Sequence, residues 1–284
     1  MLTRRDLAGA ALTAAAVPAA MGLGGAPALA QAPADEATFD RIRRTKVLRA
    51  AALPGELPYF KKDLATGEWS GAAVDFAKDI AKVMDVKIEW LESTYGNSVL
   101  DLQSNKIDLA FSLNPTPARA LVIDFTHAVI NHGFGMVTRK GFTAKTWSDI
   151  NKPEVRVVCD LGSVHETSAR RFAPKSQITA YKTRDECVLA VQSGRADCVI
   201  MAVLIGVTAV AKNPTLGEFV MLTGPRVQLP TCMGIRKEPD KRWRDFLDAW
   251  VDYNRGIGQI REWIYAGLAL NDVKPETIPA EVEF

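Results

Sequence analysis

Charged and polar side chains follow several of the apolar, strand-like runs in this sequence, and their types suit the binding of a small charged molecule. Arg119 comes after the third run, and its guanidinium group can form two parallel hydrogen bonds with a carboxylate, which lysine cannot reproduce. Glu56 and Asp160 follow two other runs and offer carboxylates to a cationic group. Ser163 and Val164 lie after a glycine where a helix is expected to begin, and backbone N–H groups at that position favour an anion.

The order of apolar segments indicates how these residues are brought together. The run at residues 47–53 has strand length, and residues 74–84 carry apolar side chains at the spacing of an amphipathic helix. Strands are expected at 87–91 and 108–113, with a helix at 98–102 between them. This alternation is typical of a mainly parallel sheet flanked by helices, which places the chain in the α/β class.

The same order begins again near residue 155. It predicts strands and helices in turn at residues 155–159, 166–172, 177–181, 184–192 and 197–201, followed by a strand at 232–236 and helices at 242–253 and 257–268. Two such units predict two lobes with a cleft between them. In open α/β sheets the ligand lies beyond the carboxyl ends of the strands, so the residues that follow these strands are the candidates for a site.

Six segments follow one another in a recognisable order: GAAVDFAKDI at 71–80, LQSNKID at 102–108, TPARALVIDFT at 116–126, GSVHET at 162–167, GRAD at 194–197 and CMGIRK at 232–237. Together they resemble family 3 solute-binding proteins, the extracytoplasmic receptors of polar amino-acid ABC transporters. The resemblance covers residues 46–268. It implies the type II periplasmic-binding-protein fold, in which two lobes joined by two crossover strands close on a ligand by hinge bending.

The resemblance also implies where the lobes divide. Lobe 1 is expected to comprise residues 37–138 plus 230–284, and lobe 2 residues 139–229, with crossovers at 138–140 and 226–230. The implied function is capture of a small carboxylate-bearing ligand, such as an amino acid, and delivery to a membrane permease. We expect a monomer without cofactor or bound metal and without catalytic residues.

Several roles follow from the family's pattern. The matching arginine of the family holds the ligand's carboxylate, which assigns that role to Arg119. Ser112 and Asn114 stand at family positions that offer hydrogen bonds to the ligand, and Tyr95 matches an aromatic position that stacks on it. The same tyrosine could instead be half-buried in a loop.

One position departs from this pattern. The family commonly has an aspartate that binds the ligand's α-ammonium, and the matching residue here is Ala202. A buried ammonium without a counter-charge is strongly disfavoured. If Glu56 and Asp160 both face the cleft, they could replace the missing acid. If Glu56 is solvated and Asp160 bonds only nearby backbone, the ligand is an acid without an α-amine.

Two other functions are compatible with the same fold, because fold does not fix function. One is a periplasmic dehydratase of the cyclohexadienyl dehydratase type, with Glu56 or Asp160 as general acid or base. The other is a sensor or a partner of a redox enzyme. Hydrolase, zincin and nucleotide-binding motifs are absent from the sequence, and the three histidines do not have metal-ligand spacing.

The first 32 residues read as an export signal. Arg4 and Arg5 precede an uncharged apolar run that ends on small residues suited to cleavage, which predicts a periplasmic protein exported by the general or the twin-arginine route. A membrane anchor is the alternative, since the run is about long enough to span a bilayer. The composition is that of an ordinary globular protein, and the net charge of +2 argues against nucleic-acid binding. Four cysteines, at positions 159, 187, 198 and 232, leave the disulfide state open.

Overall fold

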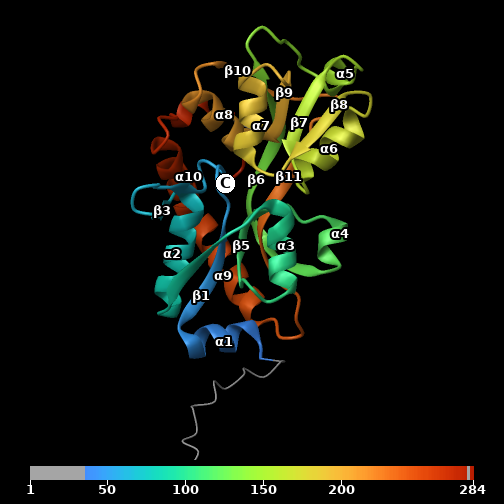
Figure 1. Ribbon diagram of the computed structural model, residues 1–284. Helices are drawn as coiled ribbons and strands as arrows, with labels where there is room; N and C mark the ends of the chain where they lie inside the picture. Colours follow the sequence, from blue (N-terminus) through green and yellow to red (C-terminus); the bar gives the residue numbers. More distant parts are fainter. Residues whose placement is uncertain (1–35, 280–281) are drawn as a thin grey trace, which may run out of the picture. The chain divides into compact units, whose positions relative to one another are not determined.

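Two sets of strands and helices, joined by two long strands, make up the part of the chain that the computed structural model describes, residues 36–279 and 282–284 (Figure 1). The expected export signal at 1–32 lies outside the described residues. We call the set that contains the first strands lobe 1 and the other set lobe 2. The two joining strands are β6 (Ile123–Arg139) and β11 (Gln228–Arg236).

The elements of the two lobes alternate as the apolar pattern predicts. Lobe 1 contains α1 (Thr38–Thr45), β1 (Val47–Ala52), β2 (Lys61–Lys62), β3 (Trp69–Ser70), α2 (Ala72–Met84), β4 (Lys87–Glu92), α3 (Tyr95–Gln103), β5 (Ala110–Leu113), α4 (Pro117–Ala120), α9 (Arg242–Gly256) and α10 (Gln259–Ala269). Lobe 2 contains α5 (Trp147–Ile150), β7 (Arg156–Asp160), α6 (Val164–Phe172), β8 (Gln177–Tyr181), α7 (Arg184–Gln192), β9 (Cys198–Ala202), α8 (Val203–Lys212) and β10 (Leu216–Met221). A 3-10 turn, Pro275–Thr277, precedes the C-terminal residues.

Both lobes use the same strand arrangement. In lobe 1, β4 and β1 are parallel, a parallel bridge between Ala50 and Leu109 connects β1 to the start of β5, and β11 and β6 add antiparallel strands. In lobe 2, β8, β7 and β9 are parallel, and β6 and β10 add antiparallel strands. The α/β fold class expected from the sequence is confirmed. The antiparallel additions explain why each sheet is only mainly parallel.

Strand β6 passes from one lobe to the other without interruption. Its residues from Ile123 to Gly133 pair with β11, and its residues from Phe134 to Thr138 pair with β9. The strand therefore changes partners between Gly133 and Phe134. The reason is that the run after Gly133 is buried and extended, with β9 on one side and β10 on the other. Gln228, the first residue of β11, pairs with Gly133 at the same point, and the lobe boundaries and crossovers expected from the sequence stay a prediction.

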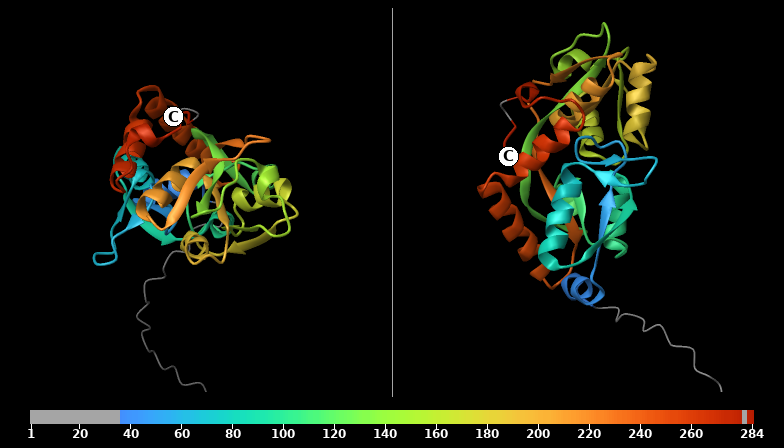
Figure 2. Two further views of the ribbon diagram at one scale, coloured as in Figure 1. Left: turned by 90° about the horizontal axis from the view of Figure 1, so that it is seen from above. Right: turned by 90° about the vertical axis from the view of Figure 1, so that its left-hand side faces the viewer.

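The C-terminal helices return to lobe 1 (Figures 1 and 2). Trp243 of α9 is almost fully buried, and its indole N–H donates to the carbonyl oxygen of Asp108 at 3.0 Å. Trp250 of the same helix stacks on Trp263 of α10 with 5.8 Å between ring centroids. The hydrogen bond of Trp243 attaches α9 to the residues before β5, and the ring of Trp250 also packs against that of Phe76 in α2.

In each lobe, an aspartate just before one strand binds an arginine of a nearby strand in the same way. Asp108, just before β5, accepts hydrogen bonds from the backbone N–H and the guanidinium of Arg49 in β1. Asp197, just before β9, accepts the equivalent bonds from Arg156 in β7 and a further bond of 2.7 Å from Arg139. Burial acts to raise the pKa of Asp197, but these hydrogen bonds outweigh it and lower the pKa from 3.8 to about 2.

This shift predicts an acid-dependent loss of stability. Because the folded-state pKa lies below the unfolded value, the contribution of Asp197 is complete above about pH 4 and is lost as the pH falls toward 2. Asp197→Asn should therefore lower the free energy of unfolding by about 2 kcal/mol at neutral pH. Urea unfolding at a series of pH values checks this, and the gap between wild type and variant should narrow in acid. A gap that stays constant with pH would contradict the assignment.

Candidate functional site

Helix caps position Tyr95, one of the predicted site residues, and Arg184 at the junction of the lobes. Thr94 caps α3 by accepting the N–H of Asn97, which makes Tyr95 the first residue of that helix. Thr183 and Glu186 form a reciprocal capping box at the start of α7, so Arg184 takes the first position there. These helices follow β4 and β8, so their first residues lie at the carboxyl ends of the strands, where ligands of open α/β sheets bind.

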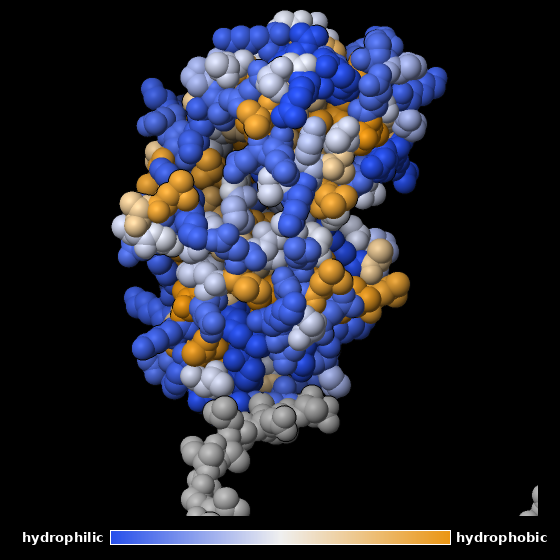
Figure 3. Space-filling view, in the orientation of Figure 1, coloured by the Kyte–Doolittle hydropathy of each residue, from blue (hydrophilic) through white to orange (hydrophobic). Residues whose placement is uncertain are grey.

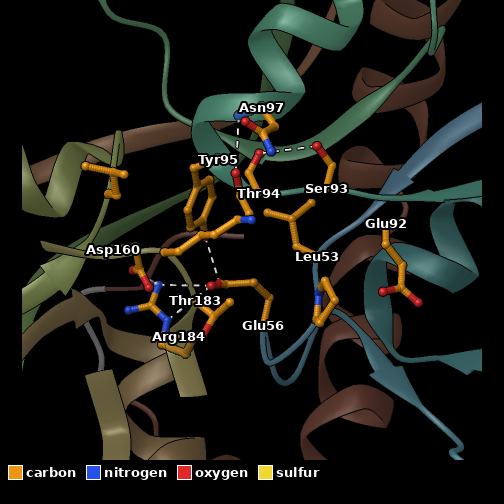
Figure 4. A pocket seen from close by; sticks show the side chains of 13 residues that line it. Leu53, Glu56, Glu92, Ser93, Thr94, Tyr95, Asn97, Asp160, Thr183 and Arg184 are labelled. Atoms are coloured by element: carbon orange, nitrogen blue, oxygen red, sulfur yellow. Dashed lines mark hydrogen bonds and ion pairs between the residues drawn. The ribbon is translucent and has the colours of Figure 1, made fainter. Parts of the chain in front are cut away.

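Glu56, Arg184 and Asp160 form a buried ionic cluster that connects the lobes (Figure 4). Glu56 lies in the loop after β1, and its Oε1 accepts hydrogen bonds from Nε and Nη2 of Arg184 at 3.1 and 3.0 Å. Nη2 of Arg184 also lies 2.5 Å from Oδ2 of Asp160, at the end of β7. All three residues are less than 5% exposed. Neither acid is solvated, and the arginine of the protein itself is their common partner.

Two further side chains complete this cluster. The hydroxyl group of Tyr95 donates to Oε2 of Glu56 at 2.7 Å. The Nδ1 atom of His165, the second residue of α6, lies 3.5 Å from Oδ2 of Asp160, and its ring lies against that of Phe134. Burial lowers the pKa of His165, so its ring is neutral at pH 7.

The cluster contains more acidic groups than basic ones. Burial raises the pKa of Glu56, and the positive charge of Arg184 opposes that shift. Burial alone would lower the pKa of Arg184, but the charges of Asp160 and Glu56 outweigh it and raise the pKa. The cluster thus contains two carboxyl groups and one guanidinium, so it offers at most one excess negative charge.

A second group of predicted residues surrounds a much smaller space. Tyr95, Ser112, Asn114 and Ala202 line a cavity of about 10 Å³, together with Tyr59, His132, Ile205 and Thr231. That volume is about the minimum for one water molecule. The amide N–H of Asn114 already donates to the carbonyl oxygen of Pro230 at 2.8 Å. A ligand the size of an amino acid therefore enters this space only if the lobes move apart.

Ser112 stands out by its backbone. Its φ angle of 59° lies in the left-handed region, although the residue belongs to β5. That conformation costs a residue other than glycine about 1 kcal/mol or more and persists where the surroundings impose it. The neighbouring pairing of β5 with β11 shifts register between Cys232 and Gly234. The distorted strand end places Ser112 against the small cavity.

Arg119 reaches across the junction from lobe 1. Nη1 donates to the carbonyl oxygen of Asn114 and Nη2 to that of Gly162 in lobe 2, each at 3.0 Å. Burial lowers the pKa of this guanidinium. Among the residues that the structure describes, no carboxylate lies within ion-pair distance of it. Arg119 is thus a partly buried cation whose partners are two neutral carbonyl groups.

Ser163 and Val164 lie opposite Arg119 at the start of α6. The hydroxyl of Ser163 caps the helix by accepting the N–H of Glu166, and it donates to the carbonyl oxygen of Asp160 at 2.7 Å. Val164 is the first residue of α6, so its backbone N–H has no acceptor within the helix. The side chain of Ser163 is therefore occupied, and the backbone of Val164 is the group at this position that suits an anion.

A cavity of about 270 Å³ adjoins the ionic cluster (Figure 4). Its walls come from both lobes and include Glu56, Tyr95, Asp160 and Arg184. Thr94, Asn97 and Thr183 add polar side chains, and Leu53 and Leu161 add apolar ones. This volume is close to the lower end of the range for small-molecule sites.

Other features bear on the expectations from the sequence. All four cysteines are buried and free, and the described residues contain no cluster of side chains suited to a metal. No helix in the described ranges is long and apolar enough to cross a membrane. On the face drawn in Figure 3, apolar residues form small separate groups among hydrophilic ones.

The sequence did not single out Arg184. It lies at the start of a helix, where an arginine is usually solvated, and its burial depends on Glu56, 128 positions earlier in the chain. The only local signal is the capping box, in which Thr183 and Glu186 fix the first turn of α7.

A two-lobed α/β protein with a polar junction between its lobes defines the class of the type II periplasmic binding proteins, and comparison with known proteins places the chain within it. Residues 48–252 match the family of bacterial extracellular solute-binding proteins, family 3. The chain belongs to this family, as the six segments predicted.

Individual relatives are more distant. The chain is 25% identical, over 63% of its length and 69% of the relative's, to a probable histidine-binding protein of Campylobacter jejuni. It is 24% identical, over 60% of its length and 67% of the relative's, to an arginine-binding extracellular protein of Bacillus subtilis. Among solved structures, an ancestral amino acid-binding protein that is a precursor of cyclohexadienyl dehydratase is 26% identical, with a TM-score of 0.71 over 80% of this chain and all of that one.

Proposed function

We propose that this protein is a periplasmic receptor that captures a small carboxylate-bearing ligand, an amino acid or a related compound, between its lobes for uptake by an ABC transporter. The observation that carries the proposal is Arg119, a partly buried guanidinium that reaches from lobe 1 to Gly162 of lobe 2 without a carboxylate partner. A carboxylate is the anion that matches its two-pronged geometry.

The residues around Arg119 support this role. Ser112 and Asn114 precede it on the same strand end, and the backbone N–H of Val164 lies on the opposite lobe. A ligand held between Arg119 and Val164 would contact both lobes at once. It would therefore favour the closed arrangement by its differential affinity, and the closed form would dock on a membrane permease. We propose that the receptor acts as a monomer.

A thermal-shift screen tests the proposal. The protein that begins at residue 33 is heated with millimolar amounts of α-amino acids, amines and amine-free carboxylates. A ligand of the native state raises the unfolding midpoint with the logarithm of its concentration. We expect at least one carboxylate to raise the midpoint by several degrees, while its methyl ester does not. If no carboxylate in the panel raises it, the receptor proposal is contradicted.

An enzyme of the dehydratase type is the second candidate, because Glu56 is a buried carboxyl with a raised pKa beside a cavity. Such a group can serve as a general acid. We place this function second, since both oxygens of Glu56 already accept hydrogen bonds from Arg184 and Tyr95, which leaves neither oxygen free to approach a substrate. A cyclohexadienyl acid in the same panel tests this candidate, since its conversion to an aromatic product is seen by ultraviolet absorbance.

A further inference from the structure

The ionic cluster already contains the kind of cation that an arginine-like ligand would bring. Three polar contacts of Arg184 are directed at the two acids: Nε and Nη2 to Glu56, and Nη2 to Asp160. A guanidinium paired with one carboxylate from each lobe is the arrangement expected for a bound cationic side chain. Here the chain itself supplies that guanidinium, from the first residue of α7.

We infer that Arg184 is a specificity-determining residue: its guanidinium is a built-in counter-ion that occupies the cation position of the cleft and excludes ligands with a cationic side chain. The inference deepens the proposed function, on which it rests for the existence of a ligand. It separates this protein from relatives named for arginine and histidine.

Three properties of the cluster explain why Arg184 excludes a cationic ligand instead of merely competing with it for the two carboxyl groups. First, Arg184 is only 3% exposed, so a soluble cation cannot reach the carboxylates without displacing it. Second, both oxygens of Glu56 are occupied, since Arg184 donates to Oε1 and Tyr95 donates to Oε2. Third, Arg184 is covalently attached and held at its position by the capping box, so it loses little freedom on pairing, whereas a free ligand also loses translational freedom.

The charge of the cluster limits how many positive charges a bound ligand can carry. Two carboxyl groups and one guanidinium leave at most one negative charge, which can favour no more than a single α-ammonium nearby. A ligand with both an α-ammonium and a cationic side chain would bring two positive charges to a cluster that offers at most one negative charge. The structure thus assigns the site to a carboxylate ligand whose side chain is neutral or acidic, with or without an α-amine.

Removal of Arg184 tests this directly. Arg184→Ala leaves two buried carboxylates without a cation, so we expect a lower unfolding midpoint than in the wild type. Methylguanidinium at millimolar concentration should then raise the midpoint of the variant by a few degrees and leave the wild type unchanged. The matched control is Arg139→Ala, which removes a partly exposed arginine from Asp197 away from the cleft and should not respond.

The outcomes are distinct. An equal response of wild type and Arg184→Ala, or no response of the variant, overturns the inference. If Arg184→Ala does not fold, the double variant Glu56→Gln/Arg184→Met replaces it, because it removes one charge of each sign and leaves Asp160 without its guanidinium. That variant should respond to methylguanidinium, and its failure to do so overturns the inference.

Binding measurements on the wild-type protein test the exclusion of cationic ligands independently of the variants. Titration calorimetry with L-arginine and L-lysine should show no binding at micromolar concentrations, and micromolar binding of either would refute exclusion. Methylguanidinium carries no carboxylate, so its effect on the variants does not depend on Arg119. A failure of the proposed receptor function, in which no carboxylate binds, is therefore distinguishable from a failure of this inference.

Discussion

Arg119→Ala is expected to weaken binding of the carboxylate ligand by about two to three orders of magnitude and to leave the fold intact. Loss of one partner of a desolvated, hydrogen-bonded charge pair costs about 2–5 kcal/mol, and each 1.4 kcal/mol is about tenfold in the dissociation constant. The fold should persist because the Arg119 side chain donates only to two backbone carbonyls. Titration calorimetry with a carboxylate from the thermal-shift screen measures the loss.

Two control variants make this result specific. Arg119→Lys keeps the positive charge but loses the two parallel N–H donors of the guanidinium. Its affinity for the carboxylate ligand should therefore lie between those of the wild type and the alanine variant. Arg170→Ala removes an exposed arginine of α6 that pairs with Glu166, and it should bind as the wild type does. Unchanged affinity in Arg119→Ala would mean that the carboxylate is held elsewhere.

The largest effect on stability is expected at Trp243. Trp243→Ala empties a fully buried site in α9 and removes the indole N–H that donates to Asp108, so the free energy of unfolding should fall by about 3–5 kcal/mol. Urea unfolding followed by circular dichroism measures it. This change also tests the proposal that residues 230–284 belong with lobe 1, because Trp243 joins α9 to Asp108, two residues before β5.

The comparison variants lie at the same position and on the same helix. Trp243→Phe keeps an aromatic ring and loses the hydrogen bond to Asp108, so the free energy of unfolding should fall by less than in Trp243→Ala. Tyr253→Ala removes a side chain that is 66% exposed, and it should change stability by less than about 0.5 kcal/mol. Equal losses for Trp243→Ala and Tyr253→Ala would show that α9 does not stabilise lobe 1.

Much of the architecture was predictable because its signal is local. The strands at 47–53 and 177–181 are short apolar or alternating runs, and the structure contains β1 and β8 there. The helix α2 was predictable from its apolar residues, which occur at helical spacing. Strand β6 was missed, since polar residues such as His127 and Asn131 and the glycines after them interrupt its apolar pattern. Helix α8 was missed because its apolar residues surround it on most sides.

The candidate site was predictable only in part, because its contacts are long-range. The types of Arg119, Glu56 and Asp160 and their places after strands indicated polar groups at the junction. Their partners did not follow from sequence, since Glu56 meets Arg184 only when the lobes face each other. The sequence left open whether the two acids are available to a ligand's ammonium. The structure shows them on the wall of a cavity and already paired with Arg184.

A crystal structure of the protein with a carboxylate from the screen is the most direct test of the central claim. We predict that the ligand's carboxylate lies about 3 Å from the guanidinium nitrogens of Arg119 and that Arg184 still bridges Glu56 and Asp160. A ligand whose carboxylate lies away from Arg119, with Arg119 still bonded only to the carbonyls of Asn114 and Gly162, would contradict the account.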